Sequence, residues 1–323
     1  ALVPLSEIPV SGIWLAVSTD LVTDPSDRPA AFGLLLSVVE AGVLLGLLLG
    51  FVIPIEAAIS VAACMFIVAN IYIVTCFPET LPSGRRKPWH GCLMMPGVGL
   101  KILVRSELFR RLSFVIVMYC FVGAGVARQA GSFLMMYLAW TRRAGIIFAI
   151  ISQVSTILWL SCGLRLITSR LGVIGVLALS GLAGMMYCLG FMCVTEIWQV
   201  WTLAALLAGP LALSFPAISA LKSQVGAEHE QGQIQGALTA AKGLAESLAP
   251  AFFGALFQVT ERLSQRGPIS GLFFAVGALL LMLALLVVAS LPPLLGPPPS
   301  KSVPHLRDGL LGTSPEGDAG VRA

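Results

Sequence analysis

The sequence predicts an all-α polytopic membrane protein, and its composition and its apolar runs both support that class. Of the 323 residues, 57% are hydrophobic and only 11% are charged, and the mean hydropathy is +0.92. A soluble domain carries roughly 25% charged residues. Eight apolar runs of 21 to 27 residues are present, and about 20 apolar residues are enough for a membrane-spanning helix. A soluble enzyme, a coiled coil, a disulfide-stapled secreted domain and a nucleic-acid binder are therefore excluded.

The expected membrane-spanning helices follow one another with mostly short connections. They are 31–53, 55–77, 112–138, 144–164, 172–194, 197–221, 236–258 and 268–290. Residues 9–19 have the character of the end of a further helix before them. Residues 291–323 are rich in Pro, Gly and Ser, and because that composition cannot bury a core we expect a disordered tail.

Basic residues are unequally distributed between the two faces that alternating spans define. Four lie on one face, namely Arg142, Arg143, Arg262 and Arg266, and fourteen lie on the other. The fourteen fall within residues 20–30, 78–111, 165–171, 222–235 and 291–323. Cytoplasmic loops carry the excess of Lys and Arg, so we predict that this second face is cytoplasmic and that the C-terminus lies there.

The longest connection, 78–111, separates two spans from the six that follow. Its second half, KILVRSELFRR (101–111), repeats basic residues near helical spacing with apolar residues between them. One interpretation is a short helix lying on the anionic inner leaflet of the membrane. The other is a solvated basic linker between two bundles, and the sequence leaves both open.

Two stretches resemble the major facilitator superfamily of transporters. Residues 215–257 resemble the end of its C-terminal half, most closely in the tetracycline-resistance type and the hippocampus abundant transcript proteins. The matching features are FPAISAL (215–221), Gln231-Gly232, Gln235-Gly236 and Ala249-Pro250-Ala251, where Gly-Pro-Ala is usual. Upstream, Asp20, Arg28, Phe32 and Gly33 resemble the cytoplasmic loop joining the family's fourth and fifth helices.

The resemblance implies a fold of twelve helices in two six-helix halves that move by alternating access. This chain would then lack roughly the first three helices, and we expect about three and a half more before Ala1. Residues 1–77 would be the remnant of the N-terminal half, comprising the end of helix 4 and helices 5 and 6. Residues 78–111 would form the inter-half loop, 112–290 the C-terminal half, and 291–323 the cytoplasmic tail.

The implied function is secondary active transport of a small organic solute across a lipid membrane, with a proton gradient as one candidate driving force. The alternative is a non-transporting pseudo-transporter or scaffold, or an inactive fragment. No arrangement typical of a catalytic site is present. The three histidines lie outside the spans and no Cys-x-x-Cys pair occurs, so we expect neither metal nor cofactor.

Acidic residues in the first two spans have different expected roles. Glu40 lies about ten residues into its span, where exposure to lipid would be costly. It could bind a proton or a cation, or it could pair locally and hold the bundle together. Glu56 follows Pro54 at a helix start, where a carboxylate simply meets the positive end of the helix dipole.

Arg128 and Gln129 lie in the middle of a span among Gly and Ala residues. Small neighbours allow a guanidinium to reach across a cavity, and Arg can hold a carboxylate through two parallel hydrogen bonds. The corresponding helix of the resembling family commonly lines the substrate cavity. A role in binding solute and a structural pair between helices are both open.

Lys242 and Glu246 are four residues apart, so they share one helix face and can pair with each other. The structural interpretation is a self-neutralised pair that fixes helix packing. The functional hypothesis is that Lys242 and Arg128 present positive charge to an anionic or zwitterionic solute. Glu246 would then be their counter-ion or a proton carrier.

Glycines and prolines supply the remaining candidates. Gly42, Gly46 and Gly50 line one helix face, where their lack of side chains would let another helix approach closely. Their position matches the family's antiporter motif, although Leu47 and Phe51 replace a Pro and a Gly of that motif, and we favour a packing role. Pro210 and Pro216 should kink the 197–221 span and could serve as a gating hinge.

Overall fold

The computed structural model describes residues 14, 17, 18, 21, 22, 27–76, 101–225, 231–263 and 271–291, and these ranges contain helices and no strand. The first helices are α2 (Arg28–Val52) and α3 (Ile55–Cys76). A short 3-10 turn, η2 (Lys101–Val104), leads into α5 (Glu107–Tyr137). The next elements are α6 (Arg142–Leu158), the π-helical turn η3 (Trp159–Gly163) and α7 (Leu164–Met192). The last are α8 (Ile197–Ala212), α9 (Ser214–Val225), α10 (Gln231–Leu263) and α11 (Leu272–Ala289).

Within the described residues, six helical stretches are long and apolar enough to cross a membrane. They are Arg28–Gly50, Glu56–Cys76, Glu107–Tyr137, Arg142–Met192, Ile197–Lys222 and Leu272–Ala289. All eight expected spans fall largely on described helices, although they are not eight separate stretches. The 51-residue stretch Arg142–Met192 contains two expected spans. The expected span 236–258 lies inside α10, a 33-residue helix outside the six stretches because its polar first turns, Lys242 and Glu246 lower its hydropathy.

The expected connection at 165–171 is helical. The π-helical turn continues directly into α7, and the helix is interrupted only at Gly172, whose φ is 69° and ψ is 176°. Leu, Arg and Ile propagate a helix well, whereas glycine adopts positive φ without a Cβ clash. The boundary between the two expected spans is therefore the single residue Gly172.

The basic segment 101–111 does not form one helix of its own, because residues 101–104 make a 3-10 turn and α5 begins at Glu107. Its contact with the inner leaflet and its solvation as a linker both stay predictions. Ser106 caps α5, because its Oγ accepts a hydrogen bond from the Phe109 backbone N–H at 3.3 Å. Residues from Glu107 onward are thus the first turns of α5 itself. Leu103 of η2 is buried against Ala237 and Ala241 of α10. Residues 77–100 of this connection lie outside the described residues.

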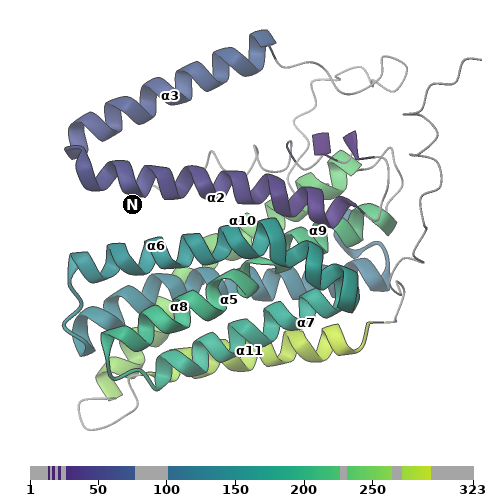
Figure 1. Ribbon diagram of the computed structural model, residues 1–323. Coiled ribbons are helices and arrows are strands. Elements are labelled where there is room, and N and C mark those ends of the chain that lie inside the picture. Colours follow the sequence, from purple (N-terminus) through teal and green to yellow (C-terminus); the bar gives the residue numbers. More distant parts are fainter. Residues whose placement is uncertain are drawn as a thin grey trace, which may run out of the picture.

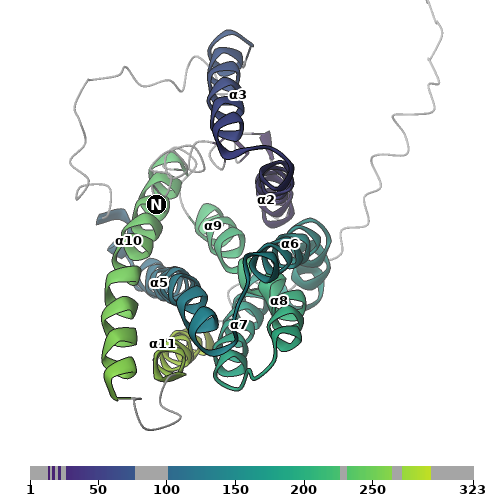
Figure 2. The same cartoon turned by 90° about the vertical axis from the view of Figure 1, so that its left-hand side faces the viewer.

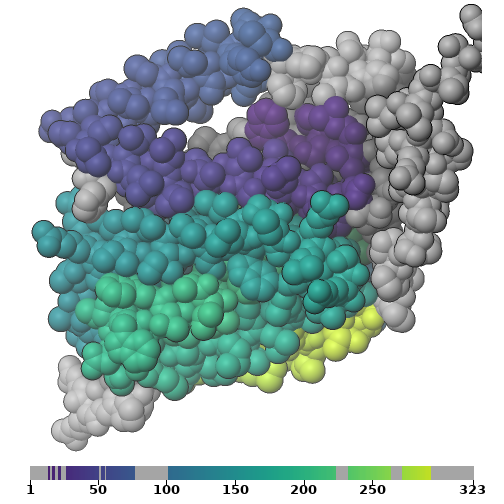
Figure 3. Space-filling model, in the orientation of Figure 1, coloured from purple at the N-terminus to yellow at the C-terminus, as the bar shows by residue number. Residues whose placement is uncertain are grey.

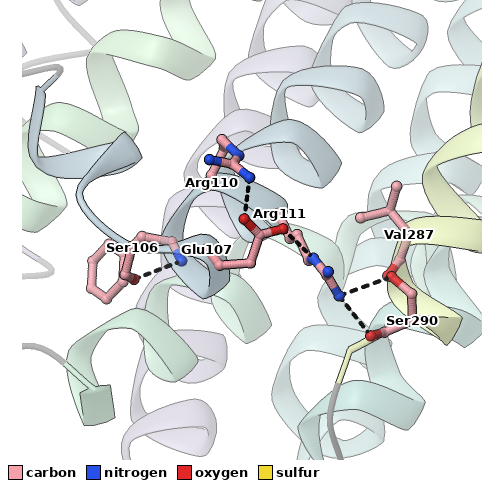
Figure 4. Close-up of polar contacts among 7 residues, drawn as sticks. Ser106, Glu107, Arg110, Arg111, Val287 and Ser290 are labelled. Carbon is pink, nitrogen blue, oxygen red and sulfur yellow. Dashed lines mark hydrogen bonds and ion pairs between the residues drawn. The ribbon is translucent and has the colours of Figure 1, made fainter.

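The start of α5 is tied to the end of α11, 179 residues later in the chain, as Figure 4 shows. Glu107 accepts hydrogen bonds from both Arg110 and Arg111, the latter at 2.8 Å. Arg111 also donates to the Ser290 backbone carbonyl at 2.8 Å. These groups are exposed, so the contacts set the position of the two ends more than they add stability.

Helices α5 to α11 form one bundle, with α2 on its side next to α6 and α3 beyond α2 (Figures 1 and 2). Helix α5 packs against α10, α11 and η2, and the Tyr119 hydroxyl donates to the Leu177 carbonyl of α7 at 3.0 Å. The core between these helices is aromatic and aliphatic, with Phe253, Phe273 and Phe274 fully buried.

Helix α3 diverges from the bundle, leaving open space between it and α2 in Figure 3. Of its described side chains, all but Ala58 are exposed, and most are apolar. An apolar surface of this extent is untenable in water and is the surface that a lipid bilayer covers. The helices therefore have the exposure pattern of a membrane protein.

Candidate functional site

The predicted pair on α10 is present. The Lys242 ammonium lies 2.8 Å from Glu246 Oε1 and 3.0 Å from Oε2, so it is bonded to both carboxylate oxygens. The side chains are 32% and 34% exposed. The pair is partly exposed, so a small molecule can reach it. This geometry confirms that the two residues pair, and it leaves their role to be established.

Two other helices supply the surroundings of this pair. The Lys242 ammonium lies over the ring of Phe215 on α9, 5.6 Å from the ring centroid. Cys120 of α5 is close enough to interact electrostatically with both charges. The pair therefore faces the region where α5, α9 and α10 meet, at the side of the bundle where Figure 2 places these three helices together.

Arg128 and Gln129 lie further along α5. This helix runs parallel to α10, since Leu103 packs on Ala237 at one end and Gln129 lies against Gly254 at the other. A Cβ on Gly254 would be 3.2 Å from Gln129 Nε2. Gly254 is twelve residues beyond Lys242, which at 1.5 Å per residue places Gln129 about 18 Å along the helix axis from Lys242.

Arg128 is exposed, and within the described residues it makes no hydrogen bond or ion pair. Because it neighbours Gln129 in sequence, it lies roughly two to three turns beyond Glu246 along the bundle. The structure therefore does not bring Arg128 and Lys242 together as one two-cation site. They are two separate basic positions along the α5–α10 pair.

Glu40 has a partner on another helix. The Gln153 amide of α6 donates to Glu40 Oε2 at 2.7 Å and lies 3.4 Å from the Glu40 backbone oxygen. This contact joins α2 to α6, as expected if Glu40 pairs locally and helps to hold the bundle together. Sequence reasoning does not single out Gln153, because a lone Gln in an apolar run carries no spacing signal.

The glycines of α2 behave in opposite ways. A Cβ on Gly42, Gly46 or Gly50 would meet nothing within 4 Å, so no described helix approaches that face and its packing role stays a prediction. A Cβ on Gly33 would instead be 2.6 Å from the Leu160 carbonyl oxygen of η3. Gly33 is therefore the glycine at which the backbone of α2 comes closest to η3. It lies inside α2 and not in the loop that the sequence motif predicts.

The rest of the expected loop motif lies at the start of α2. Arg28 is the first residue of this helix and is buried, and Phe32 is fully buried. Asp20 lies outside the described residues.

The two prolines flank a break in their span, as expected. Helix α8 ends at Ala212 and α9 begins at Ser214, so the interruption falls between Pro210 and Pro216. Ser155 of α6 adds to the distortion, because its hydroxyl donates to the Ala205 carbonyl at 2.9 Å and accepts from the Gly209 N–H at 3.2 Å. A side chain inserted into a helix ladder is a recognised cause of bending. A hinge function for this break stays a prediction.

Comparisons with known proteins agree with this geometry. A scan against models of protein families gives no match. Hippocampus abundant transcript 1 protein of Mus musculus and that of Homo sapiens are each 24% identical over 284 residues, which is 82% of this chain and 57% of theirs. Hippocampus abundant transcript-like protein 1 of Homo sapiens is 31% identical over 112 residues, covering 30% of this chain and 22% of that protein.

Among solved structures, the human organic anion transporter MFSD10 (TETRAN) superposes with a TM-score of 0.72 at 18% identity, over 86% of this chain and 67% of that one. The chain has the fold of the major facilitator superfamily. The predicted fold class and the multi-pass membrane character are confirmed, and the similarity is to transporters and not to enzymes. The chain spans about 57% of the length of the curated relatives it matches. The tetracycline-type assignment and the lack of the first helices stay predictions.

Proposed function

We propose that this protein is a secondary active transporter that moves a small organic anion or zwitterion by alternating access. The observation that carries the proposal is the Lys242–Glu246 ion pair, partly exposed on α10 of a major facilitator fold. Charges within a membrane are costly, and a scaffold has no need to tolerate them. The structural neighbour MFSD10 is an organic anion transporter, and this supports an anionic solute here.

The pair suggests how a proton could be coupled to solute. When Glu246 is ionised, both of its carboxylate oxygens accept from the Lys242 ammonium. A proton added to Glu246 removes the negative charge, so Lys242 becomes free to donate to a solute carboxylate. Loss of that proton restores the pair and displaces the solute. Glu246 and the solute thus compete for one cation, and Lys242 serves as a point charge without the two-pronged grip of an Arg.

Arg128 and Gln129 would provide a second polar position on the solute pathway, about 18 Å from Lys242 by helix rise. The break between α8 and α9 at Pro210 and Pro216 would let one end of this span move relative to the other. We place the face bearing residues 101–111 and the C-terminus in the cytoplasm, because that face carries the excess of basic residues.

The test is uptake of radiolabelled p-aminohippurate, an organic anion, and glycine, a zwitterion, by the native protein in proteoliposomes. Lys242→Met should abolish both pH-gradient-driven uptake and solute counterflow. Glu246→Gln should keep counterflow, because Lys242 remains available, but lose dependence on the pH gradient. Glu56→Gln, an exposed carboxylate at the start of α3, is the matched control and should behave as wild type.

Transport at wild-type rates by correctly inserted Lys242→Met and Glu246→Gln variants between pH 5 and 8 would make the pair structural. Absence of uptake of both probes by the wild-type protein would favour the scaffold alternative.

A further inference from the structure

Lys222 on α9 is a buried lysine that has no part in the proposed transport mechanism. Its side chain is on α9, and the residue is 0% exposed. Its ammonium donates to the Ser113 hydroxyl of α5 at 2.6 Å and lies 5.6 Å from the centroid of the Phe109 ring. No carboxylate of the described residues forms an ion pair with it.

Within the described residues, Lys222 has a hydrogen-bond partner but no counter-charge. An ammonium has three N–H donors, and the described hydrogen bond uses one. The Ser113 hydroxyl is neutral, and it also lies within hydrogen-bond distance of the Phe109 and Leu103 carbonyls, to which it can donate. A second cation, the Arg105 guanidinium, lies 4.7 Å from the centroid of the same Phe109 ring. Removing a charge from water without a counter-charge is costly.

Three polar atoms on the neighbouring turns of α9 and α10 make no hydrogen bond within the described residues. Ser219 Oγ, Gln235 Oε1 and Thr239 Oγ1 are buried and make no hydrogen bond. Ser219 precedes Lys222 by one turn on the same face of α9, and the Gln235 amide of α10 donates to the Ser219 carbonyl at 3.1 Å. Thr239 follows Gln235 by one turn on α10. Buried polar atoms are nearly always satisfied, so three unsatisfied atoms on the helices that enclose a buried lysine call for a further partner.

We propose that the Lys222 cluster, defined as Ser113, Ser219, Lys222, Gln235 and Thr239, binds a small inorganic anion of the chloride class. The donors are the remaining N–H groups of Lys222 and the hydroxyls of Ser219 and Thr239. Gln235 is held by its bond to the Ser219 carbonyl, and its Oε1 accepts from Lys222 or from a water that accompanies the anion. Water alone would satisfy the hydroxyls but would leave the buried positive charge without a counter-charge.

The location favours an anion as well. The same end of the bundle carries the exposed cations Lys101 and Arg105 just before α5, whereas Arg110 and Arg111 are paired with Glu107. Clustered charge of one sign raises the local concentration of counter-ions. The bound anion would join α5, α9 and α10 near the end of α9 opposite the α8–α9 break, and it would be a structural ligand distinct from the transported solute.

The first test measures thermal unfolding of the purified full chain in sodium chloride and in sodium gluconate at equal ionic strength. Chloride should raise Tm in proportion to the logarithm of its concentration above Kd, by about 3 °C at tenfold above Kd. Lys222→Met should lose this shift, and Arg110→Gln, an exposed cation at the same end, should keep it. A wild-type protein whose Tm does not respond to chloride, or a Lys222→Met variant with the wild-type shift, would overturn the proposal.

A second pair of variants keeps the lysine, in case its removal prevents folding. Thr239→Val should raise the Kd for chloride about tenfold, the loss expected for one hydrogen bond to a charged group. The variant would then need about ten times more chloride than wild type for the same rise in Tm. Thr260→Val is the matched control on α10, because that hydroxyl is equally buried but already donates to the Phe257 carbonyl at 2.8 Å. If Tm depended on chloride concentration equally in the two variants, the proposed site would be contradicted. Bromide-soaked crystals should show anomalous density within hydrogen-bond distance of Lys222 Nζ, and its absence would also count against it.

Discussion

Replacing Gly33 with alanine should destabilise the contact between α2 and the bundle. The added Cβ would lie 2.6 Å from the Leu160 carbonyl oxygen and 2.6 Å from Leu164 Cδ2. The leucine methyl can rotate away, but the carbonyl oxygen belongs to the η3 backbone and cannot move alone. Overpacking of this kind costs about 1–3 kcal/mol, and the better helix propensity of alanine returns about 1 kcal/mol. The net effect should be a loss of up to about 2 kcal/mol.

The matched control is Gly42→Ala in the same helix. A Cβ there meets nothing within 4 Å, so the only contribution is helix propensity and the variant should be as stable as wild type or more so. Thermal unfolding of the purified proteins in one detergent gives the comparison, and Gly33→Ala should melt up to about 6 °C lower than wild type. Equal melting temperatures for the two variants would show that α2 does not cross η3 at Gly33.

Three further outcomes are expected. Ser106→Ala should lower the free energy of unfolding by about 1 kcal/mol through loss of the α5 cap, whereas Ser106→Asp should restore it; equal thermal stability of the two variants would refute the cap. A double-mutant cycle on Glu40→Ala and Gln153→Ala should give a coupling energy of about 1 kcal/mol, and additive effects in chemical unfolding would refute the α2–α6 bond. Protease-cleavable epitopes inserted at Ser83 and Ser300 should resist digestion in sealed right-side-out vesicles, and cleavage from outside would reverse the proposed orientation.

Local features of the structure could be predicted because they depend on residues close together in the chain. The apolar runs indicated the helices, and the four-residue spacing of Lys242 and Glu246 indicated their ion pair. Pro210 and Pro216 likewise indicated a break that is present between α8 and α9. The division of the segment 101–111 between a 3-10 turn and the start of α5 was not predicted, although the Ser106 hydroxyl and Glu107 at the next position, which mark the start of a helix, are visible in the sequence.

Membrane class and helical content were thus determined by the sequence alone, since hydrophobicity and helix propensity act over a few residues. Which residues face one another was decided by the tertiary structure. Helices such as α2 and α11 are apolar on all sides, so their sequences contain no stripe that fixes rotation about the helix axis. For that reason only the packed structure distinguishes Gly33 from Gly42, pairs Glu40 with Gln153, and separates Arg128 from Lys242. The burial of Lys222 also required the structure, because three helices distant in sequence must meet to enclose it.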